Sequence, residues 1–392
     1  MYFADLHIHS KYARATSRDC DIPHLELWAR RKGIALVGTG DFTHPAYRAE
    51  LKEQLMADGG GFYTLKSQYR LEPGFNPGFC PRFVISGEIS CIYKRGGRVR
   101  KVHNLILLPA LEAADRLSWQ LEAVGNIRSD GRPILGLDSE QLLALTLESC
   151  PDAVFIPAHI WTPHFSMLGA FSGFESVEQC FGKLSKHIFA LETGLSSDPA
   201  MNWQVSALDG YTLVSNSDAH SPQKLGREAN MLSCEMSYRG LKRALETGAG
   251  FEGTVEFFPD EGKYHLDGHR ACGLCLTPLE TEKYGGICPV CGKKITVGVE
   301  HRVLELADRP QGFKPQGAKE YKSLIPLVEV AADGLGVSPN SKKAQSLYFK
   351  LVYELGPEFY ILTEAKLADV EALGSKAVST ALQLMREGRV IK

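Results

Sequence analysis

The amino-acid sequence predicts an α/β protein: a distorted seven-stranded barrel, followed by a cysteine-rich unit and a small helical domain. Three observations support this prediction. Short apolar runs alternate with helical patterns from residue 2 to residue 247. Two Cys-x₂-Cys pairs then occur between residues 272 and 291. An amphipathic helical pattern fills most of residues 321–392.

The apolar runs have the length and composition of buried strands. Several are rich in Val, Ile and Phe, as strands covered on both faces usually are. Helical patterns lie between most of them, so we expect a mostly parallel sheet. Seven runs favour an incomplete or distorted barrel over an open sheet. The runs are residues 2–9, 34–41, 82–93, 102–109, 153–159, 188–193 and 212–218, and the helical patterns include residues 23–32, 110–124, 138–149 and 238–247.

Changes in composition divide the chain into three predicted parts. Residues 1–258 form the barrel, residues 265–305 the cysteine unit, and residues 315–392 the helical C-terminal domain. Stretches containing Gly and Pro near residues 258–262 and 309–312 are interpreted as linkers. Residues 58–81, also rich in Gly and Pro, are interpreted as a long excursion or flap, with an ordinary loop of buried aromatics as the alternative.

Composition limits the functional class. With 44% hydrophobic and 23% charged residues, the 392-residue chain is typical of a globular protein rather than a disordered or fibrous one. No window of about 18 uninterrupted apolar residues predicts a membrane span. The chain reaches a charge at Asp5, unlike a signal peptide. Six scattered cysteines then indicate reduced thiols, so we expect a cytoplasmic protein that does not engage a membrane. Because the formal net charge is −2, any nucleic acid must be bound through a local basic patch.

The first apolar run carries Asp5, His7 and His9 at a period of two. In a strand these three side chains share one face, while Leu6 and Ile8 point the other way. Two imidazoles and a carboxylate on one face can bind a metal ion. A pair of core histidines is the alternative that this motif alone leaves open.

Similar polar residues recur in or at the ends of the other runs. In α/β barrels the carboxyl ends of the strands carry the chemistry. Buried charges are costly unless they are paired or bind a metal. One shared metal cluster therefore explains these residues more economically than several separate core positions. They are Asp41, Glu88, His103, His159, Glu192, Asp218 and His220.

The segments around these residues resemble, in order and spacing, the motifs of the polymerase and histidinol phosphatase (PHP) superfamily. They are Asp5–Ser10, Thr39-Gly40-Asp41, Gly87-Glu88, His103, Ala158-His159 and Ser217–His220. The resemblance implies a PHP-type barrel that holds two or three divalent ions (zinc, manganese or magnesium) for phosphoester hydrolysis. It implies one ion on His7, His9, Glu88 and Asp218, a second on Glu88, His103 and His159, and a third on Asp41 and His220.

Two departures from the superfamily pattern affect the third ion. Many members read Thr-Asp-His where this chain reads Thr39-Gly40-Asp41, so Asp41 stands in the usual histidine place and His44 is a rival ligand. Arg14 stands near the place of a further ligand, with Asp19 the nearest carboxylate. The third position is therefore expected to be weaker or built differently.

The sequence leaves the roles of two other polar residues open. His164 could contact a phosphate or protonate a leaving oxygen, or it could be a loop histidine without a role. Glu192 could orient a metal-bound histidine, or it could only pair with a nearby base.

The cysteine unit has the spacing of a structural zinc site. Cys272, Cys275, Cys288 and Cys291 form two Cys-x₂-Cys turns, each presenting two thiolates to one tetrahedral ion. A complete set of four thiolates leaves no open position for catalysis. A redox pair or disulfides are the alternatives.

Residues 94–101 form a cationic hairpin between Glu88 and His103. Gly96-Gly97 reads as the tip between two strand runs. Cations beside a metal site can neutralise the phosphates of a nucleic acid. A solvated hairpin with chance charges is the alternative. The five cations are Lys94, Arg95, Arg98, Arg100 and Lys101.

The three-part order of barrel, cysteine unit and helical domain resembles the endonuclease Q family. This resemblance implies a metal-dependent DNA-repair endonuclease that cuts on the 5′ side of deaminated bases (uracil, hypoxanthine, xanthine) or abasic sites. It also implies a flipped lesion in a pocket, for which Phe75, Phe79, Trp161, Phe165 and Phe171 are candidate walls. A small-molecule phosphatase of the histidinol-phosphate type is the alternative. A replication clamp is a candidate protein partner.

Overall fold

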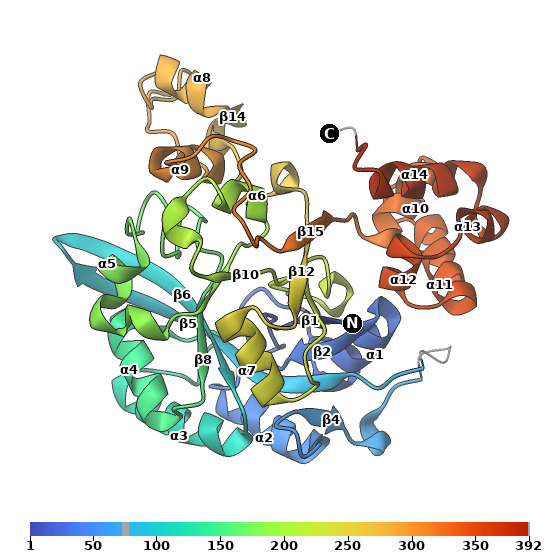
Figure 1. Cartoon of the computed structure of the whole chain (residues 1–392), viewed down its shortest axis with the longest axis horizontal. Coiled ribbons are helices and arrows are strands. Elements are labelled where there is room, and N and C mark those ends of the chain that lie inside the picture. Colours follow the sequence, from blue (N-terminus) through green and yellow to red (C-terminus); the bar gives the residue numbers. More distant parts are fainter. Residues whose placement is uncertain (73–77, 391–392) are drawn as a thin grey trace.

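The computed structural model describes residues 1–72 and 78–390. It contains an 11-stranded mixed sheet, a separate pair β9–β10 and a small hairpin β13–β14 (Figure 1). The strands are β1 (Tyr2–Asp5), β2 (Ile34–Gly38), β3 (Leu55–Ala57), β4 (Tyr63–Leu65), β5 (Arg82–Arg95), β6 (Arg98–Leu108), β7 (Ile134–Leu135), β8 (Val154–Pro157), β9 (Ala190–Glu192), β10 (Thr212–Val214), β11 (Ala229–Leu232), β12 (Phe251–Glu256), β13 (Asp267–His269), β14 (Leu274–Leu276) and β15 (Glu320–Ser323).

Helices pack around the sheet and form the C-terminal region. The four helical patterns named from the sequence are confirmed as α1, α3, α4 and α7, and Gly248 ends α7 in the left-handed conformation (φ 71°). None of the helices in the described ranges is long and apolar enough to cross a membrane. The helices are α1 (Ile22–Lys32), α2 (Pro45–Gln54), α3 (Leu111–Val124), α4 (Ser139–Ser149), α5 (Val177–Phe181), α6 (Pro199–Asn202), α7 (Tyr238–Thr247), α8 (Pro278–Lys283), α9 (Val299–Leu306), α10 (Leu327–Leu335), α11 (Lys342–Leu355), α12 (Glu358–Thr363), α13 (Leu367–Leu373) and α14 (Lys376–Arg386).

Each of the seven apolar runs contains a strand, namely β1, β2, β5, β6, β8, β9 and β10. The sheet is less parallel than predicted. β1, β2 and β5 are parallel neighbours, but β6 runs antiparallel to both β5 and β8. The reason is the tight turn at Gly96-Gly97, where both glycines have positive φ and no helix separates the strands. Among the described residues, β9 and β10 pair with each other in a separate two-stranded sheet. Closure into a seven-stranded barrel therefore stays a prediction.

The excursion at residues 58–81 is tied to the sheet in its described part. β4 pairs with β3 and, through Tyr63 opposite Phe83, with β5. Phe62 and Tyr63 are buried. Phe75, named as a candidate pocket wall, lies outside the described residues.

The cysteine unit projects from one end of the molecule (Figure 1). It consists of the hairpin β13–β14 and helix α8. Helix α9 follows and connects the unit to the N-terminal α/β region, because Arg302 donates hydrogen bonds to the carbonyls of Leu168 and Phe174.

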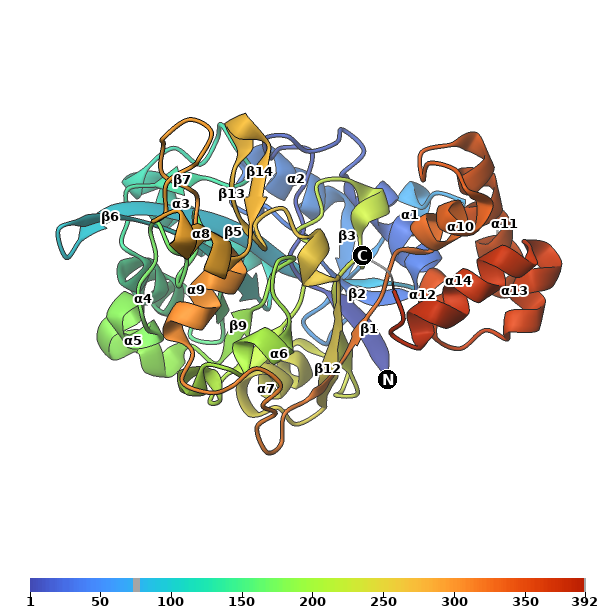
Figure 2. The same cartoon turned by 90° about the horizontal axis from the view of Figure 1, so that it is seen from above.

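The helical C-terminal region is attached to the N-terminal α/β region in two ways. β15 adds to the sheet in parallel with β12 before the helices begin. Helix α12 then packs beside α1, and both views show these helices together (Figures 1 and 2). At this contact Lys32 Nζ lies 2.7 Å from Glu358 Oε2, and both side chains are at most 5% exposed. Phe3 stacks on Phe359 with ring centroids 4.2 Å apart.

Replacing Glu358 by Ala should destabilise the protein by about 3–5 kcal/mol, since it leaves the Lys32 ammonium buried without its partner. Equilibrium denaturation in urea measures this change, and hydrogen exchange should show lost protection in α10 and α12. The double variant Lys32→Met with Glu358→Leu should recover most of the stability. If the stability of the double variant did not recover, the ion pair would contribute through its specific geometry and not only by neutralising two buried charges.

Candidate metal centre

The loops that follow β1 and β10 lie side by side. Ile8 and Ala219 form a parallel bridge, and the His9 amide donates to the Ala219 carbonyl at 2.9 Å. Asp41, His159 and Asp218 have positive φ angles of 47°, 28° and 46°, a conformation that costs non-glycine residues roughly 1–3 kcal/mol. Such strain is often found at functional sites. Here it turns three of the sequence-predicted residues toward one region.

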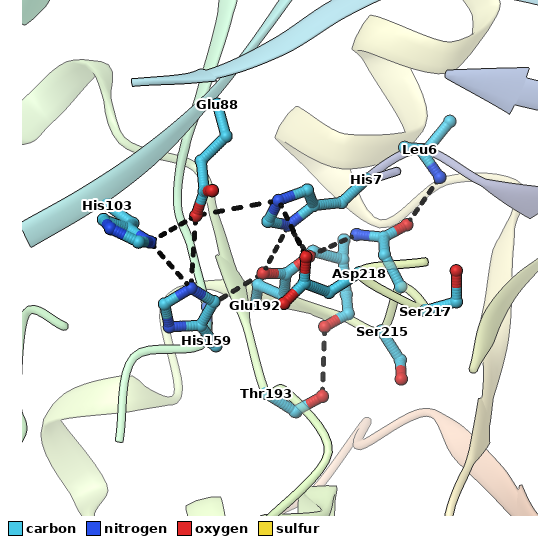
Figure 3. Close-up of polar contacts among 12 residues, drawn as sticks. Leu6, His7, Glu88, His103, His159, Glu192, Thr193, Ser215, Ser217 and Asp218 are labelled. Carbon is cyan, nitrogen blue, oxygen red and sulfur yellow. Dashed lines mark hydrogen bonds and ion pairs between the residues drawn. The ribbon is translucent and has the colours of Figure 1, made fainter. Parts of the chain in front are cut away.

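Glu88 approaches three of the predicted ligands, His7, His103 and His159 (Figure 3). Its Oε1 is 2.6 Å from His103 Nδ1, 3.2 Å from His159 Nε2 and 3.7 Å from His7 Nε2. Its Oε2 is 3.4 Å from His9 Nε2. Oε1 therefore faces three histidines and Oε2 faces the fourth, so this one carboxylate could contribute to more than one ion.

Asp218 and His220 approach the cluster beside His9. Asp218 Oδ1 is 3.1 Å from His9 Nε2 and 3.9 Å from His7 Nε2. The ring centroids of His9 and His220 are 4.6 Å apart. Donor atoms within 4.8 Å of one another therefore form three overlapping groups: His7–His9–Glu88, Glu88–His103–His159, and His9–Asp218–His220.

Unpartnered buried atoms test whether these residues fit metal ions. His7 Nε2, His9 Nε2 and Asp218 Oδ1 are buried and have no hydrogen-bond partner in the described part of the chain. Leaving buried polar atoms unsatisfied costs roughly 1–3 kcal/mol each. All three atoms face one another, and imidazole nitrogen and carboxylate oxygen are ligands for zinc and similar divalent ions. The cluster fits divalent metal ions.

Protons compete with metals for this cluster. Burial lowers the pKa of His7 and of His9, but the surrounding carboxylates together outweigh it, and both pKa values lie well above the ordinary value. Glu192 and Glu88 act on His7, and Asp41, Asp218 and Glu88 act on His9. Burial lowers the pKa of His103 to about 4. Because an imidazole must be deprotonated to bind a metal, ion binding should release protons from His7 and His9.

Two carboxylates orient His7 and His9 by contacting their Nδ1 atoms. Both oxygens of Glu192 lie 3.0 Å from His7 Nδ1, and they also accept from the His159 amide and the Asn216 side chain, each at 2.8 Å (Figure 3). Asp41 Oδ1 lies 3.0 Å from His9 Nδ1. These contacts set the tautomer that leaves each Nε2 free to bind an ion.

The structure places Asp41 differently from the expected third-ion ligand. Its second oxygen accepts from the amide and hydroxyl of Ser10, so both oxygens already have partners. The rival residue His44 donates from Nε2 to the Arg128 carbonyl and stacks on Tyr12, away from the three groups. His220 instead groups with His9 and Asp218.

Replacing Glu192 by Ala should weaken divalent-metal affinity by about 10- to 100-fold, the usual effect of losing a residue that orients a metal-binding histidine. Titration of the metal-free protein with zinc, followed by calorimetry, measures the change. The exposed Glu175 provides a matched control. Unchanged affinity in the Glu192 variant would show that His7 needs no orienting partner.

A second buried acidic layer lies behind Glu192. Glu256 accepts hydrogen bonds from the hydroxyls of Thr193 and Ser215 at 3.3 and 3.0 Å. Burial raises the pKa of Glu256 from 4.5 to about 8. Burial, reinforced by Glu256, also raises the pKa of Glu228 well above its ordinary value.

Stability should therefore fall as the pH rises from about 5 to 8. In this window the folded protein retains a proton on Glu256 that the unfolded chain releases, so raising the pH favours unfolding by up to about 1.4 kcal/mol per pH unit. Replacing Glu256 by Gln should flatten this slope in urea unfolding at a series of pH values. The exposed control Glu235→Gln should retain the wild-type slope. Equal slopes in all three proteins would contradict the assignment.

A cavity of about 510 Å³ opens beside the cluster. His103, His159 and Asp218 line one side of it, and Arg132 and Phe165 also line it. The sequence did not single out Arg132, whose Nη1 is 3.2 Å from Glu88 Oε2.

The predicted pocket-wall residues differ in whether they line this cavity. Among the described members of that set, Phe165 lines this cavity. Phe257 and Tyr264, which the sequence did not single out, line it as well. Trp161 is buried and donates to Asn202, and Phe171 is 50% exposed. His164 also lines the cavity, and its ring centroid lies 4.8 Å from that of Phe171.

The cationic hairpin projects from the molecule on the side opposite the C-terminal helices (Figure 2). Its five cations divide into two kinds. Arg95 pairs with Asp138 and Glu140 at the start of α4, and Arg100 donates to the Gly173 carbonyl, so both hold the base of the hairpin in place. Lys94 and Arg98 are exposed, and Lys101 Nζ lies 5.2 Å from the Phe165 ring at the cavity.

The cysteine unit brings together Cys272, Cys288 and Cys291. The fourth member of this group is His269, and Cys275 lies outside it.

Comparison with known proteins finds similarity along the whole chain. A family model described as the MJ0043 C-terminal domain matches residues 326–389. Protein YqxK of Bacillus subtilis is 29% identical over 411 aligned positions, covering 99% of this chain and 95% of YqxK. Protein MJ0043 of Methanocaldococcus jannaschii is 32% identical over 241 positions, which cover 59% of this chain and 29% of MJ0043.

Two solved structures match the fold over 100% of the chain. One is the lesion-specific endonuclease PfuEndoQ from Pyrococcus furiosus, with a TM-score of 0.85, 30% identity and 92% of its chain covered. The other is endonuclease Q in complex with a 27-mer duplex substrate that carries an abasic lesion at the active site, with a TM-score of 0.85, 29% identity and 93% coverage.

The fold and the histidine–carboxylate cluster define a protein of the PHP superfamily. Within that superfamily, the full-length match at 30% identity shows that the chain belongs to the endonuclease Q family.

Proposed function

We propose that this protein is a metal-dependent DNA-repair endonuclease. It hydrolyses the phosphodiester on the 5′ side of a deaminated base (uracil, hypoxanthine or xanthine) or an abasic site. The observation that carries the proposal is the convergence of three buried, unpartnered metal-binding atoms next to a cavity of about 510 Å³, which Asp218 itself lines. Support comes from the full-length likeness to an endonuclease captured with an abasic duplex.

Divalent ions held by the three groups would activate water and neutralise charge on the phosphate. The protein residues have defined tasks around them. Glu88 and Asp218 position the ions, and His7, His9, His103, His159 and His220 complete the ligand set. Glu192 and Asp41 hold His7 and His9 in the binding tautomer. Arg132 presents a cation between Glu88 and the cavity.

The cavity and the hairpin suit a polymer substrate. A flipped nucleotide in the cavity would meet Phe165 and Tyr264 on its walls, and the ligand residues beside it. Lys101 lies beside Phe165, which lines the cavity, and Lys94 and Arg98 extend the positive charge along the hairpin. These three cations would contact backbone phosphates, while Arg95 and Arg100 keep the hairpin in place.

A panel of duplexes tests the proposal. Purified protein, stripped of metal and then titrated with zinc, manganese or magnesium, is incubated with duplexes that carry uracil, hypoxanthine, xanthine or an abasic site. Nicking on the 5′ side of the lesion supports the proposal, and an unmodified duplex is the control. Rapid hydrolysis of a generic phosphomonoester with no nicking would favour the small-molecule phosphatase instead. A replication clamp as partner stays a prediction.

A further inference from the structure

Asp5 does not join the metal-binding residues that follow it in the chain. The sequence predicts that it shares a face with His7 and His9, but none of the three groups formed by the described residues includes it. Its side chain is fully buried, so its carboxylate needs partners inside the protein. Both oxygens accept hydrogen bonds from backbone amides, Oδ1 from Ser217 at 3.0 Å and Oδ2 from Gly226 at 2.9 Å. The carboxylate therefore ties the end of β1 to two points of the segment that follows β10.

Arg227 holds the same segment from the side of the cavity. Its Nε donates to the Ser217 carbonyl at 2.8 Å, and its Nη2 donates to the Asp218 carbonyl at 3.5 Å. The side chain is half-buried and lines the cavity of about 510 Å³. Ser217 thus has its amide bound by Asp5 and its carbonyl bound by Arg227, directly before Asp218 in the chain.

The backbone conformation of Asp218 explains why these contacts matter. Its φ is 46°, in the left-handed region, which costs a non-glycine residue free energy and persists only when the surroundings hold it. The carbonyls of Ser217 and Asp218 belong to the two peptide planes on either side of the Asp218 Cα, so a guanidinium bound to both restricts φ and ψ there. In this conformation Asp218 Oδ1 lies 3.1 Å from His9 Nε2 and 3.9 Å from His7 Nε2.

Gly226 gives the segment a second fixed point. It also has a positive φ of 69°, and a Cβ at this position would lie 2.8 Å from Ile34 Cδ1 and 3.2 Å from Phe359 Cε2. Side chains of β2 and α12 therefore pack directly against this glycine. Because this packing holds Gly226, its amide has a defined direction toward Asp5, and Arg227 starts from a defined position.

We propose that Asp5 and Arg227 are positioning residues for metal binding. They hold Asp218 in its left-handed conformation and so keep its carboxylate facing His7 and His9, where it can bind a metal ion. The inference rests on the proposed function only for its consequence in cleavage, because the effect on metal affinity does not depend on the substrate. Arg227 also lines the cavity, and the competing role, a contact with phosphate alone, predicts unchanged metal affinity.

Titration of the full-length protein with manganese, followed by the EPR signal of the free ion, tests the proposal. Manganese prefers carboxylate oxygens to thiolates, so the titration reports on the histidine–carboxylate cluster rather than on the cysteine unit. Arg227→Ala and Asp5→Asn should each weaken manganese affinity by about 10- to 100-fold, the usual effect of losing a residue that supports a metal ligand. In Asp5→Asn one oxygen becomes an NH₂ group, which cannot accept a hydrogen bond from a backbone amide.

Two further variants complete the comparison. Arg227→Lys should recover part of the affinity, because an ammonium can still donate to one of the two carbonyls. The exposed control Arg239→Ala should bind manganese like the wild type. Because Arg227 is half-buried, its variants keep the test available if Asp5→Asn does not fold.

A double-variant cycle separates positioning from a general structural role. If Arg227 acts through Asp218, adding Arg227→Ala to Asp218→Ala should weaken manganese affinity further by no more than about twofold. An equal loss in both backgrounds, or an affinity that Arg227→Ala leaves unchanged, would overturn the proposal. If manganese affinity changed as expected in a protein that cuts no lesion-bearing duplex, the positioning role would be supported and the proposed function contradicted.

Discussion

Alanine at His7, His9 or Asp218 is expected to reduce cleavage of a lesion-bearing duplex by about 10³-fold or more, while binding of that duplex survives. Each of these residues offers a buried, unpartnered atom to the metal cluster. Metal ions contribute several kcal/mol of transition-state stabilisation, and about 1.4 kcal/mol corresponds to tenfold in rate. DNA affinity depends mainly on cations that contact phosphates, and these remain in the variants.

Single-turnover nicking and fluorescence anisotropy measure the two effects separately, and elemental analysis measures the bound metal. The variant His187→Ala is a suitable control, because His187 lies in the short helical turn at residues 182–187, outside the three metal-binding groups. Cleavage at the wild-type rate by the triple variant His7→Ala, His9→Ala and Asp218→Ala would place the chemistry elsewhere in the molecule.

The sequence could predict that these residues lie together, because each belongs to a local pattern that strand geometry converts into position. His7 and His9 follow β1, and Asp218 follows β10. In an α/β barrel the segments that follow the strands lie at the same end of the fold. A polar residue at the end of an apolar run is therefore expected at that end, as the bridge between Ile8 and Ala219 shows for the segments after β1 and β10. Helices could be predicted for the same reason: their periodicity and caps, such as Asp138 before α4, are local.

Long-range features were not accessible from local patterns. A motif shows that Asp41 follows a strand, but not that its oxygens are bound by Ser10 and His9. The antiparallel direction of β6 depends on a turn of two glycines rather than on the apolar run itself. His269 lies in no cysteine motif, and only the pairing of β13 with β14 brings it to the thiolates.

Arg132 illustrates the same limit in the metal centre. It precedes β7, a strand of two residues that pairs with Ser90 and Cys91 of β5. The Ser90 amide also donates to the Pro133 carbonyl at 3.0 Å. A strand this short leaves no recognisable period in the sequence, yet it holds Arg132 close to Glu88, which is two residues before Ser90.

Replacing Arg132 by Ala is expected to lower the cleavage rate by about 10²- to 10³-fold, the usual effect of removing one donor that stabilises transition-state charge. Its Nη1 is 3.2 Å from Glu88 Oε2, and the side chain lines the cavity, so its other N–H groups can reach a phosphate oxygen there. The nearby Glu88 carboxylate raises the pKa of Arg132, which keeps the guanidinium charged. Lys at this position should restore only part of the rate, because a single ammonium cannot bind Glu88 and a phosphate in the same planar arrangement.

Metal dependence distinguishes a contact with the phosphate from a purely structural role. If Arg132 only held Glu88 in place, the alanine variant would lose metal affinity, and excess metal would restore the cleavage rate. If Arg132 binds the phosphate, the rate constant under saturating metal and DNA should stay low while metal affinity changes little. Arg128→Ala is the matched control in the same loop, because Arg128 is exposed and pairs with Glu122. Full rescue of the Arg132→Ala variant by metal would assign Arg132 to the support of Glu88 alone.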